Sequence, residues 1–180
     1  MRIRNMVRCA MLTALLCICA WIGFPLGDVS ITMQTFGLFL TLGLLGGRQG
    51  TLVCLLYLLL GAVGLPVFSG FRGGLGTLVG ATGGYILGFL AAALVYWLVT
   101  AILKERFHVR LAASLLGLAV CYGFGTLWYA LVWTDGVGLS LGLILGKCVL
   151  PYLIPDLIKL SFALAAAEKL KRVISPSPDT

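Results

Sequence analysis

The stretch LGTLVGATGGYILGFLAAALVYWLVTAIL, residues 75–103, decides the fold class of this chain. It contains no charged residue. It also exceeds the roughly 20 apolar residues that a helix needs to cross the hydrocarbon core of a bilayer. Further apolar runs occupy residues 6–24, 36–46, 50–66 and 111–133, and residues 139–167 are mostly apolar. The sequence therefore predicts a protein that crosses a membrane several times.

The overall composition supports the same class of protein. Of the 180 residues, 61% are hydrophobic and 11% are charged, and the mean hydropathy is +1.09. Soluble domains carry roughly 25% charged residues, so this composition excludes a soluble enzyme, a nucleic-acid-binding protein and a disordered chain. At about 20 residues per helix plus short loops, the chain has room for about six spans and for no separate soluble domain.

The distribution of basic residues indicates how the spans are oriented. Lys and Arg collect on cytoplasmic loops, so the net charge of +7 does not imply a nucleic-acid partner. With a cytoplasmic N-terminus and six spans, most basic residues fall on the inner side: Arg2, Arg4, Arg8, Arg48, Lys104, Arg106, Arg110, Lys169, Lys171 and Arg172. Arg72 is the basic residue of the clear outer loops, and Lys147 and Lys159 fall within residues 139–167.

These observations predict an all-α integral membrane protein with six transmembrane helices and both termini in the cytoplasm. We expect residues 135–154 to form an outer loop with a short re-entrant or interfacial helix, and the sixth span to run inward from Pro155. A further span in this region would place the last three basic residues outside, against the positive-inside rule. One domain is expected over residues 1–174, followed by a disordered C-terminal tail over 175–180.

Residue types that catalyse reactions or hold metals are scarce in this sequence. The single histidine, His108, falls in a predicted cytoplasmic loop, and no G-x-S-x-G motif is present, which disfavours an intramembrane enzyme. Residues 142–148 resemble a phosphate-binding loop, but the spacing is one residue short and Cys148 replaces the Ser or Thr that holds Mg²⁺. The six cysteines include no C-x-x-C pair, so we expect no metal site and no cofactor.

Small residues recur at helical spacing in two places. Gly76, Gly80, Gly84 and Gly88 repeat every four residues, which allows close helix packing in lipid or a close approach of the backbone to a ligand. Ala10 and Ala14 form a small-x-x-x-small pair at the inner end of the first span. A partner helix could dock on this pair, and packing within the protein explains the spacing equally well.

The segment Pro155-Asp156-Leu157-Ile158-Lys159 carries the most unusual residues for a membrane span. Proline suits the first helical position, and the helix dipole favours a carboxylate in the first turn. Asp156 and Lys159 are three residues apart and share one helix face. Ionisable residues in a span cost about 2.5–3.5 kcal/mol each and usually face a bundle interior or a cavity. The pair is either a local ion pair near the interface or a ligand contact.

Other polar or amphipathic residues are expected at a matching depth. Thr32 and Gln34 begin the second span, and Tyr85 lies about 12 Å into the fourth at a rise of 1.5 Å per residue. Trp128 lies about 9 Å from the outer end of the fifth span. Tyr85 and Trp128 are typical interface aromatics when taken singly. Together with Asp156 and Lys159, these residues could line one pocket open to the outside.

Several segments in this order resemble the BioY family, the biotin-binding substrate-capture subunits (S-components) of energy-coupling-factor (ECF) vitamin transporters. They are residues 31–34 (ITMQ), 56–68 (LYLLLGAVGLPVF), 73–76 (GGLG), 82–85 (TGGY) and 155–159 (PDLIK). Each segment is weak evidence by itself, whereas the set at these spacings covers nearly the whole chain and is specific. The resemblance predicts a multi-pass component of a prokaryotic plasma membrane.

The resemblance also implies roles for particular residues. It implies that Asp156 and Lys159 contact biotin and makes Gln34, Gly74 and Tyr85 pocket residues. It implies that Ala10 and Ala14 dock on a transmembrane coupling subunit that bears two cytoplasmic ATPase subunits. No enzymatic activity is implied.

The chemistry of biotin fits these residues independently. Asp156 can accept hydrogen bonds from the two ureido N–H groups, and Lys159 can donate to the ureido carbonyl or neutralise Asp156. Trp128, Tyr85 and Phe68 could pack against the ring. Arg72 either pairs with the carboxylate of the valerate chain or merely steers anions from solvent. The alternatives are an S-component for another vitamin and, less favoured, an intramembrane enzyme.

Overall fold

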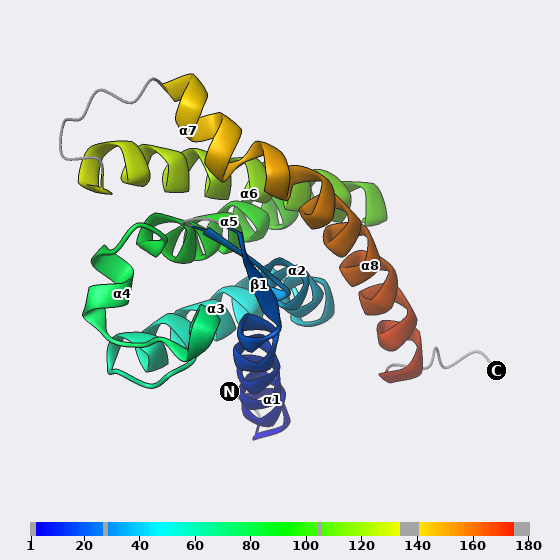
Figure 1. The fold of residues 1–180 in the computed structure, drawn as a ribbon. Helices are drawn as coiled ribbons and strands as arrows, with labels where there is room; N and C mark the ends of the chain where they lie inside the picture. The colour runs from blue at the N-terminus through cyan, green and yellow to red at the C-terminus, as the bar shows by residue number, and fades with distance from the viewer. Residues whose placement is uncertain (1–2, 27–28, 104–105, 134–140, 175–180) are drawn as a thin grey trace.

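The computed structural model describes residues 3–26, 29–103, 106–133 and 141–174, and it is mostly helical (Figure 1). Its longer helices are α1 (Ile3–Trp21), α2 (Gln34–Leu45), α3 (Gly47–Ala62), α5 (Gly83–Leu103), α6 (Phe107–Trp128) and α8 (Leu150–Ile174). Its shorter helical elements are the 3₁₀ turn η1 (Ser69–Phe71), α4 (Leu75–Val79), the π-helical turn η2 (Tyr129–Trp133) and α7 (Leu141–Cys148).

Four helices are long and apolar enough to cross a membrane, namely α1, α5, α6 continued to Val132, and α8. Helices α2 and α3 are also apolar but are shorter, with 12 and 16 residues. These findings confirm the prediction of a mostly helical membrane protein. The expected tail over 175–180 lies outside the described residues.

The prediction of an all-α fold is wrong for the segment that follows α1. The chain there forms a two-stranded antiparallel sheet of β1 (Gly23–Leu26) and β2 (Val29–Thr32), with Gly23 opposite Thr32. Pro25 lacks the N–H that a continuing helix needs, and the run Val29-Ser30-Ile31-Thr32 is rich in β-branched residues that favour strands. The sheet brings Thr32 to the start of α2.

The fourth apolar run is not one continuous helix. Residues 75–103 divide into α4 and α5, because Gly80 adopts an extended conformation (φ −70°, ψ −178°) that ends α4. The four regularly spaced glycines therefore do not form one stripe. Gly84 and Gly88 pack α5 against α6, where an added Cβ would lie 2.2 Å from Cβ of Trp128 and 3.0 Å from Sγ of Cys121 respectively. An added Cβ at Gly76 would meet open space.

The start of the last helix also differs from the prediction. A short helix precedes it, as expected, at Leu141–Cys148. However, α8 begins at Leu150, so Pro155 lies inside the helix and Asp156 is not in its first turn. Proline is tolerated inside membrane helices because neighbouring groups satisfy the backbone atoms that it frees. Asp156 and Lys159 therefore project from the second and third turns of a long helix.

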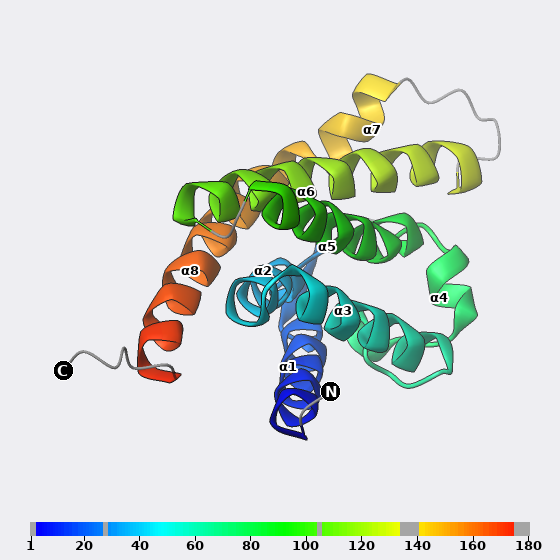
Figure 2. The same cartoon turned by 180° about the vertical axis from the view of Figure 1, so that it is seen from behind.

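The helices pack as a bundle in which α5 lies between α6 and α3, as both views show (Figures 1 and 2). Helix α2 packs against α8 and α3, and α1 packs against α2 and α3. Close contacts depend on glycine: a Cβ on Gly43 of α2 would lie 2.7 Å from Cβ of Ala167 in α8. Helices α4 and α7 lie at the same end of the α5–α6 pair, and Arg110 of α6 forms an ion pair with Glu168 of α8 near the other end.

Candidate functional site

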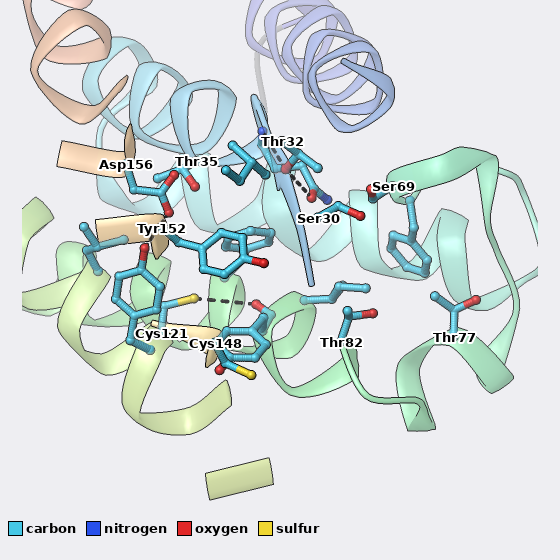
Figure 3. A pocket seen from close by; sticks show the side chains of 18 of the residues that line it. Ser30, Thr32, Thr35, Ser69, Thr77, Thr82, Cys121, Cys148, Tyr152 and Asp156 are labelled. Carbon is cyan, nitrogen blue, oxygen red and sulfur yellow. Dashed lines mark hydrogen bonds between the residues drawn. The ribbon is translucent and has the colours of Figure 1, made fainter. Parts of the chain in front are cut away.

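A cavity of about 120 Å³ lies at the end of the bundle that α4 and α7 cover. Its walls come from β2, the start of α2, the segment after α3, α4, α5, α6, α7 and α8. The polar side chains that line it are those of Ser30, Thr32, Gln34, Thr35, Ser69, Arg72, Thr77, Thr82, Tyr85, Tyr122, Tyr152 and Asp156. Figure 3 shows that Asp156 lies near one end of this cavity and that Ser69 and Thr77 lie toward the other.

Asp156 is the centre of a hydrogen-bonded cluster at its end of the cavity. Tyr122 of α6 donates its hydroxyl proton to Oδ2 of Asp156 over 2.7 Å. Nζ of Lys159 donates to Oδ1 of Asp156 over 2.9 Å and to the carbonyl oxygen of Thr32 over 2.8 Å. The side chains of Asp156 and Lys159 are only 13% and 12% exposed. The cluster therefore ties α8 to both α6 and β2 and holds a charged acceptor at the cavity wall.

A second polar chain continues from β2 into α2 and α3. The hydroxyl of Thr32 donates to Oε1 of Gln34 over 2.8 Å, and Nε2 of Gln34 donates to the hydroxyl of Tyr57 over 2.6 Å. Thr32 and Gln34 are both buried and line the cavity. Because Thr32, Gln34 and Tyr57 satisfy one another's polar groups, this part of the cavity floor keeps a defined shape.

Aromatic rings and one basic side chain form the opposite part of the wall. Phe68 is fully buried and packs edge-on against Tyr57, with ring centroids 5.4 Å apart. The backbone N–H of Phe68 donates to the carbonyl oxygen of Arg72 over 2.9 Å, which closes a tight turn through Gly70 (φ +69°). This turn places the exposed Arg72 beside Phe68 at the cavity. Tyr85 is buried, and its hydroxyl lies 3.4 Å from Oγ1 of Thr126.

The structure brings together most of the candidate residues. Thr32, Gln34, Phe68, Arg72, Tyr85 and Asp156 line the cavity, and Lys159 reaches it through Asp156. Gly74 does not line the cavity; its N–H donates to the carbonyl oxygen of Gly61 over 2.7 Å and its φ of +88° starts α4. Trp128 does not line it either; its ring covers Gly84 and its Nε1 donates to the carbonyl oxygen of Gly80 over 3.3 Å. Both residues shape the segments that surround the site.

Sequence reasoning missed several lining residues, of which Tyr122 is the most informative. Tyr122 lies six residues inward of Trp128 on α6, which is deeper than the interface level where membrane aromatics usually gather. That depth was a usable signal, because a phenol hydroxyl buried in a span needs a partner. Tyr152 and Thr35 gave no such signal.

The arrangement suits the binding of a small polar molecule. Among the described residues, no group of three or more His, Cys, Asp or Glu side chains could hold a metal ion. Asp156 can accept further hydrogen bonds, since a carboxylate has about four lone-pair sites and Tyr122 and Lys159 occupy two. Hydroxyl groups and Arg72 supply donors elsewhere in the lining, and Phe68, Ile86 and Leu118 supply apolar surface.

Comparison with known proteins identifies the family. The sequence model of the BioY family matches residues 1–176. This chain belongs to the BioY family. This chain is 40% identical over 171 residues to the biotin transporter BioY of Thermotoga maritima, and the match covers 94% of this chain and 97% of the relative. It is 38% identical over 171 residues to the probable biotin transporter BioY of Pyrococcus horikoshii, with 95% and 98% covered.

A solved structure supports the BioY fold. The crystal structure of the S-component for biotin from an ECF-type ABC transporter superimposes with a TM-score of 0.83. The two chains are 25% identical, and the match covers 95% of this chain and 92% of the other. Because the match spans nearly the whole length of both chains, this chain shares the overall fold of that S-component.

Proposed function

We propose that this chain captures biotin as the S-component of an ECF-type vitamin importer and is not an enzyme. The observation that carries the proposal is the buried Asp156 carboxylate, fixed by Tyr122 and Lys159 at the wall of the cavity in a BioY-family fold. The relatives named as biotin transporters and the crystal structure of a biotin S-component support the choice of ligand.

In the proposed complex, the ureido N–H groups of biotin donate to the free lone pairs of Asp156. A hydrogen bond to a charged group in a dry site contributes about 1.5–3 kcal/mol. Lys159 already donates to Asp156 and to the carbonyl of Thr32, which favours a role in neutralising and positioning Asp156 over donation to the ligand. Thr32 and Gln34 complete the polar floor.

The lining differs between the two ends of the cavity, with Asp156 near one end and Ser69 and Thr77 toward the other (Figure 3), which matches the two chemically different ends of biotin. With the ureido ring at Asp156, the apolar part of the ligand packs against apolar lining that includes Ile86, Leu118 and Phe68, and Tyr85 also lines the cavity. The valerate carboxylate then points toward Ser69, Thr77 and Arg72, where a guanidinium can pair bidentately with it. We assign Gly74 and Trp128 to the support of the α4 region, because Gly74 links the start of α4 to Gly61 of α3, Trp128 bonds to Gly80 at the end of α4, and neither lines the cavity.

The distribution of basic residues supports one orientation of the chain across a prokaryotic plasma membrane. We infer one domain over residues 1–174 with six spans, both termini in the cytoplasm and the cavity open to the outside. The cavity lies at the end of α3 and α5 that is remote from Arg4 and Arg8 of α1 and from Arg106 and Arg110 at the start of α6. This orientation lets biotin enter from outside.

We also propose that α1 docks on a transmembrane coupling subunit that carries two cytoplasmic ATPase subunits. Ala10 and Ala14 are exposed on α1, whereas Cys9 and Thr13 beside them are buried against the bundle. Packing within the protein therefore leaves the two alanines available to a partner helix. The remaining surface of the bundle faces membrane lipid.

Retention of labelled biotin by the detergent-purified chain tests the proposed ligand. We expect nanomolar binding of biotin and no comparable binding of riboflavin or thiamine at equal concentration. Tight binding of another vitamin in place of biotin would make the chain an S-component for that vitamin. Chemical conversion of bound biotin would contradict the assignment as a non-enzyme.

Bulky residues on α1 test the docking surface. Ala10→Leu/Ala14→Leu should leave biotin binding by the purified chain unchanged and should abolish most uptake into cells that express the coupling subunit and ATPases. Ala112→Leu/Ala119→Leu is the matched control, since both residues are exposed on α6. Equal loss of binding and uptake in the α1 variant would instead indicate packing within the protein.

A further inference from the structure

A second, larger groove lies at the opposite end of α3 and α5 from the biotin cavity. It has a volume of about 610 Å³, and its lining includes Asn5, Arg48, Gln49, Leu52, Leu55 and Trp97. Tyr85 at the biotin cavity and Trp97 at this groove are twelve residues apart on α5, which is about 18 Å along the helix. The two sites are therefore separate.

Close packing of α3 on α5 creates the floor of this groove. A Cβ on Gly47 would lie 2.4 Å from Cα of Trp97, and the hydroxyl of Thr51 donates to the carbonyl oxygen of Ala93 over 3.1 Å. Helix α3 also packs against α1, so the groove runs over α3 between a wall of α1 and a wall of α5. Gly47 and the hydrogen bond of Thr51 therefore hold α3 and α5 close together at the floor of the groove.

The groove has a polar, basic end and an apolar end. Asn5, Arg48 and Gln49 lie near the N-termini of α1 and α3, whereas Leu52 and Leu55 follow along α3. Arg48 is exposed and has no ion-pair partner among the described residues. Residues 3–21, 47–62 and 83–103, which form the three walls, contain no Asp or Glu. The positive charge at this end is therefore not neutralised by the walls themselves.

We propose that this groove binds an anionic phospholipid, with its phosphate on Arg48 and an acyl chain along Leu52, Leu55 and Trp97. A guanidinium binds a phosphate bidentately, and Asn5 and Gln49 offer amide donors beside it. Tryptophan is enriched at the level where headgroups meet acyl chains. The apolar floor distinguishes a lipid from a free phosphate ion, which would gain nothing from Leu52 and Leu55.

This lipid would not compete with the proposed docking of a coupling subunit. At 100° per residue, Asn5 is rotated around the axis of α1 by about 140° from Ala10 and by about 180° from Ala14. The groove and the alanine pair therefore occupy different faces of α1. A lipid held in the groove would contact α1, α3 and α5 together and stabilise their packing.

Thermal unfolding of the purified full chain in a neutral detergent tests the proposal, because a ligand that binds the folded state raises its melting temperature. The probes are dioleoyl phosphatidylglycerol, dioleoyl phosphatidylcholine and inorganic phosphate. We expect phosphatidylglycerol to give the largest increase and Arg48→Gln to weaken its apparent affinity at least about tenfold. Arg48→Lys should retain part of the effect, and Arg106→Gln, which removes another exposed arginine, should retain all of it.

Biotin affinity should be unchanged in all three variants, which separates this proposal from the proposed function. An undiminished response of Arg48→Gln to phosphatidylglycerol would overturn the site. An equal shift with inorganic phosphate would overturn the lipid as ligand, and an equal shift with phosphatidylcholine would overturn the requirement for an anionic lipid. Loss of the phosphatidylglycerol response when a purified coupling subunit is added would show that a protein occupies the groove instead.

Discussion

Two ion pairs in the bundle interior, near its opposite ends, have different structural roles. Asp156 and Lys159 lie three residues apart on α8, so their pairing joins no two helices, yet their further hydrogen bonds reach Tyr122 and Thr32 at the cavity. Arg110 and Glu168 join α6 to α8 and line no part of the cavity. The comparison teaches that the Arg110–Glu168 pair only holds helices together, whereas the Asp156–Lys159 pair also supplies an acceptor at the cavity.

The largest expected effect is on stability, from removing the Arg110 side of the second pair. Arg110→Met leaves Glu168 without its cation, and breaking a buried pair costs about 3–5 kcal/mol. We expect the lower end, because the Glu168 side chain is 29% exposed. The melting temperature in detergent should fall by roughly 6–12 °C.

The double variant Arg110→Met/Glu168→Met provides the control for that prediction. It removes both charges and keeps side chains of similar length, so it should recover at least half of the loss. Biotin affinity of the folded fraction should remain unchanged in both variants. A double variant as unstable as Arg110→Met would show that the ion pair is not the cause.

Asp156→Asn should produce the largest effect on ligand binding. The amide keeps the shape of the carboxylate but replaces a charged acceptor with a neutral one, at a cost of about 1.5–3 kcal/mol. Equilibrium binding of labelled biotin should weaken roughly 10- to 100-fold. Unchanged affinity would remove Asp156 from the site.

Tyr122→Phe should have a smaller effect on the same measurement. It removes the hydroxyl that donates to Oδ2 of Asp156 and keeps the ring. Biotin affinity should fall about fivefold, equivalent to roughly 1 kcal/mol, because the carboxylate loses one orienting hydrogen bond. Thr100→Val, which removes a buried hydroxyl outside the cavity lining, serves as the control and should leave the affinity unchanged.

Arg72→Ala should have the smallest effect, because an exposed ion pair contributes about 0–1 kcal/mol. If Arg72 pairs with the ligand carboxylate, biotin should bind up to about fivefold more weakly and uncharged biotin amide should bind as before. Steering alone would lower the association rate of biotin, most strongly at low salt, and leave its dissociation rate unchanged. Equal losses for biotin and its amide would contradict pairing.

The sequence predicts the cavity end of α8 well because charge is rare in this chain. Asp156 and Lys159 stand out in an apolar run, and their spacing of three residues places them on one face whatever the surrounding fold. Their partners could not be predicted in the same way. Tyr122 is 34 residues from Asp156, and the rotation of α6 that makes them meet depends on packing across the bundle.

Breaks in the helices were harder to predict than the helices. Gly80 and Gly84 have the same spacing pattern, yet Gly80 ends α4 and Gly84 packs under Trp128 within α5. Pro155 looked like a helix start, whereas α8 already begins at Leu150. Glycine and proline permit a break without requiring one, so tertiary contacts decide the outcome.

The shift in melting temperature caused by biotin most directly tests the different roles of the two ion pairs. Asp156 should be needed for biotin binding, whereas the Arg110–Glu168 pair should affect stability alone. The shift should be compared at one biotin concentration in the unmodified chain, in Asp156→Asn and in Arg110→Met/Glu168→Met. Binding to the folded state raises stability by RT ln(1 + L/Kd), where L is the free biotin concentration, so the gain falls as affinity falls. We predict a full shift in the double variant from its own lower baseline and a strongly reduced shift in Asp156→Asn. A full shift in Asp156→Asn, or its loss in the double variant, would contradict the account.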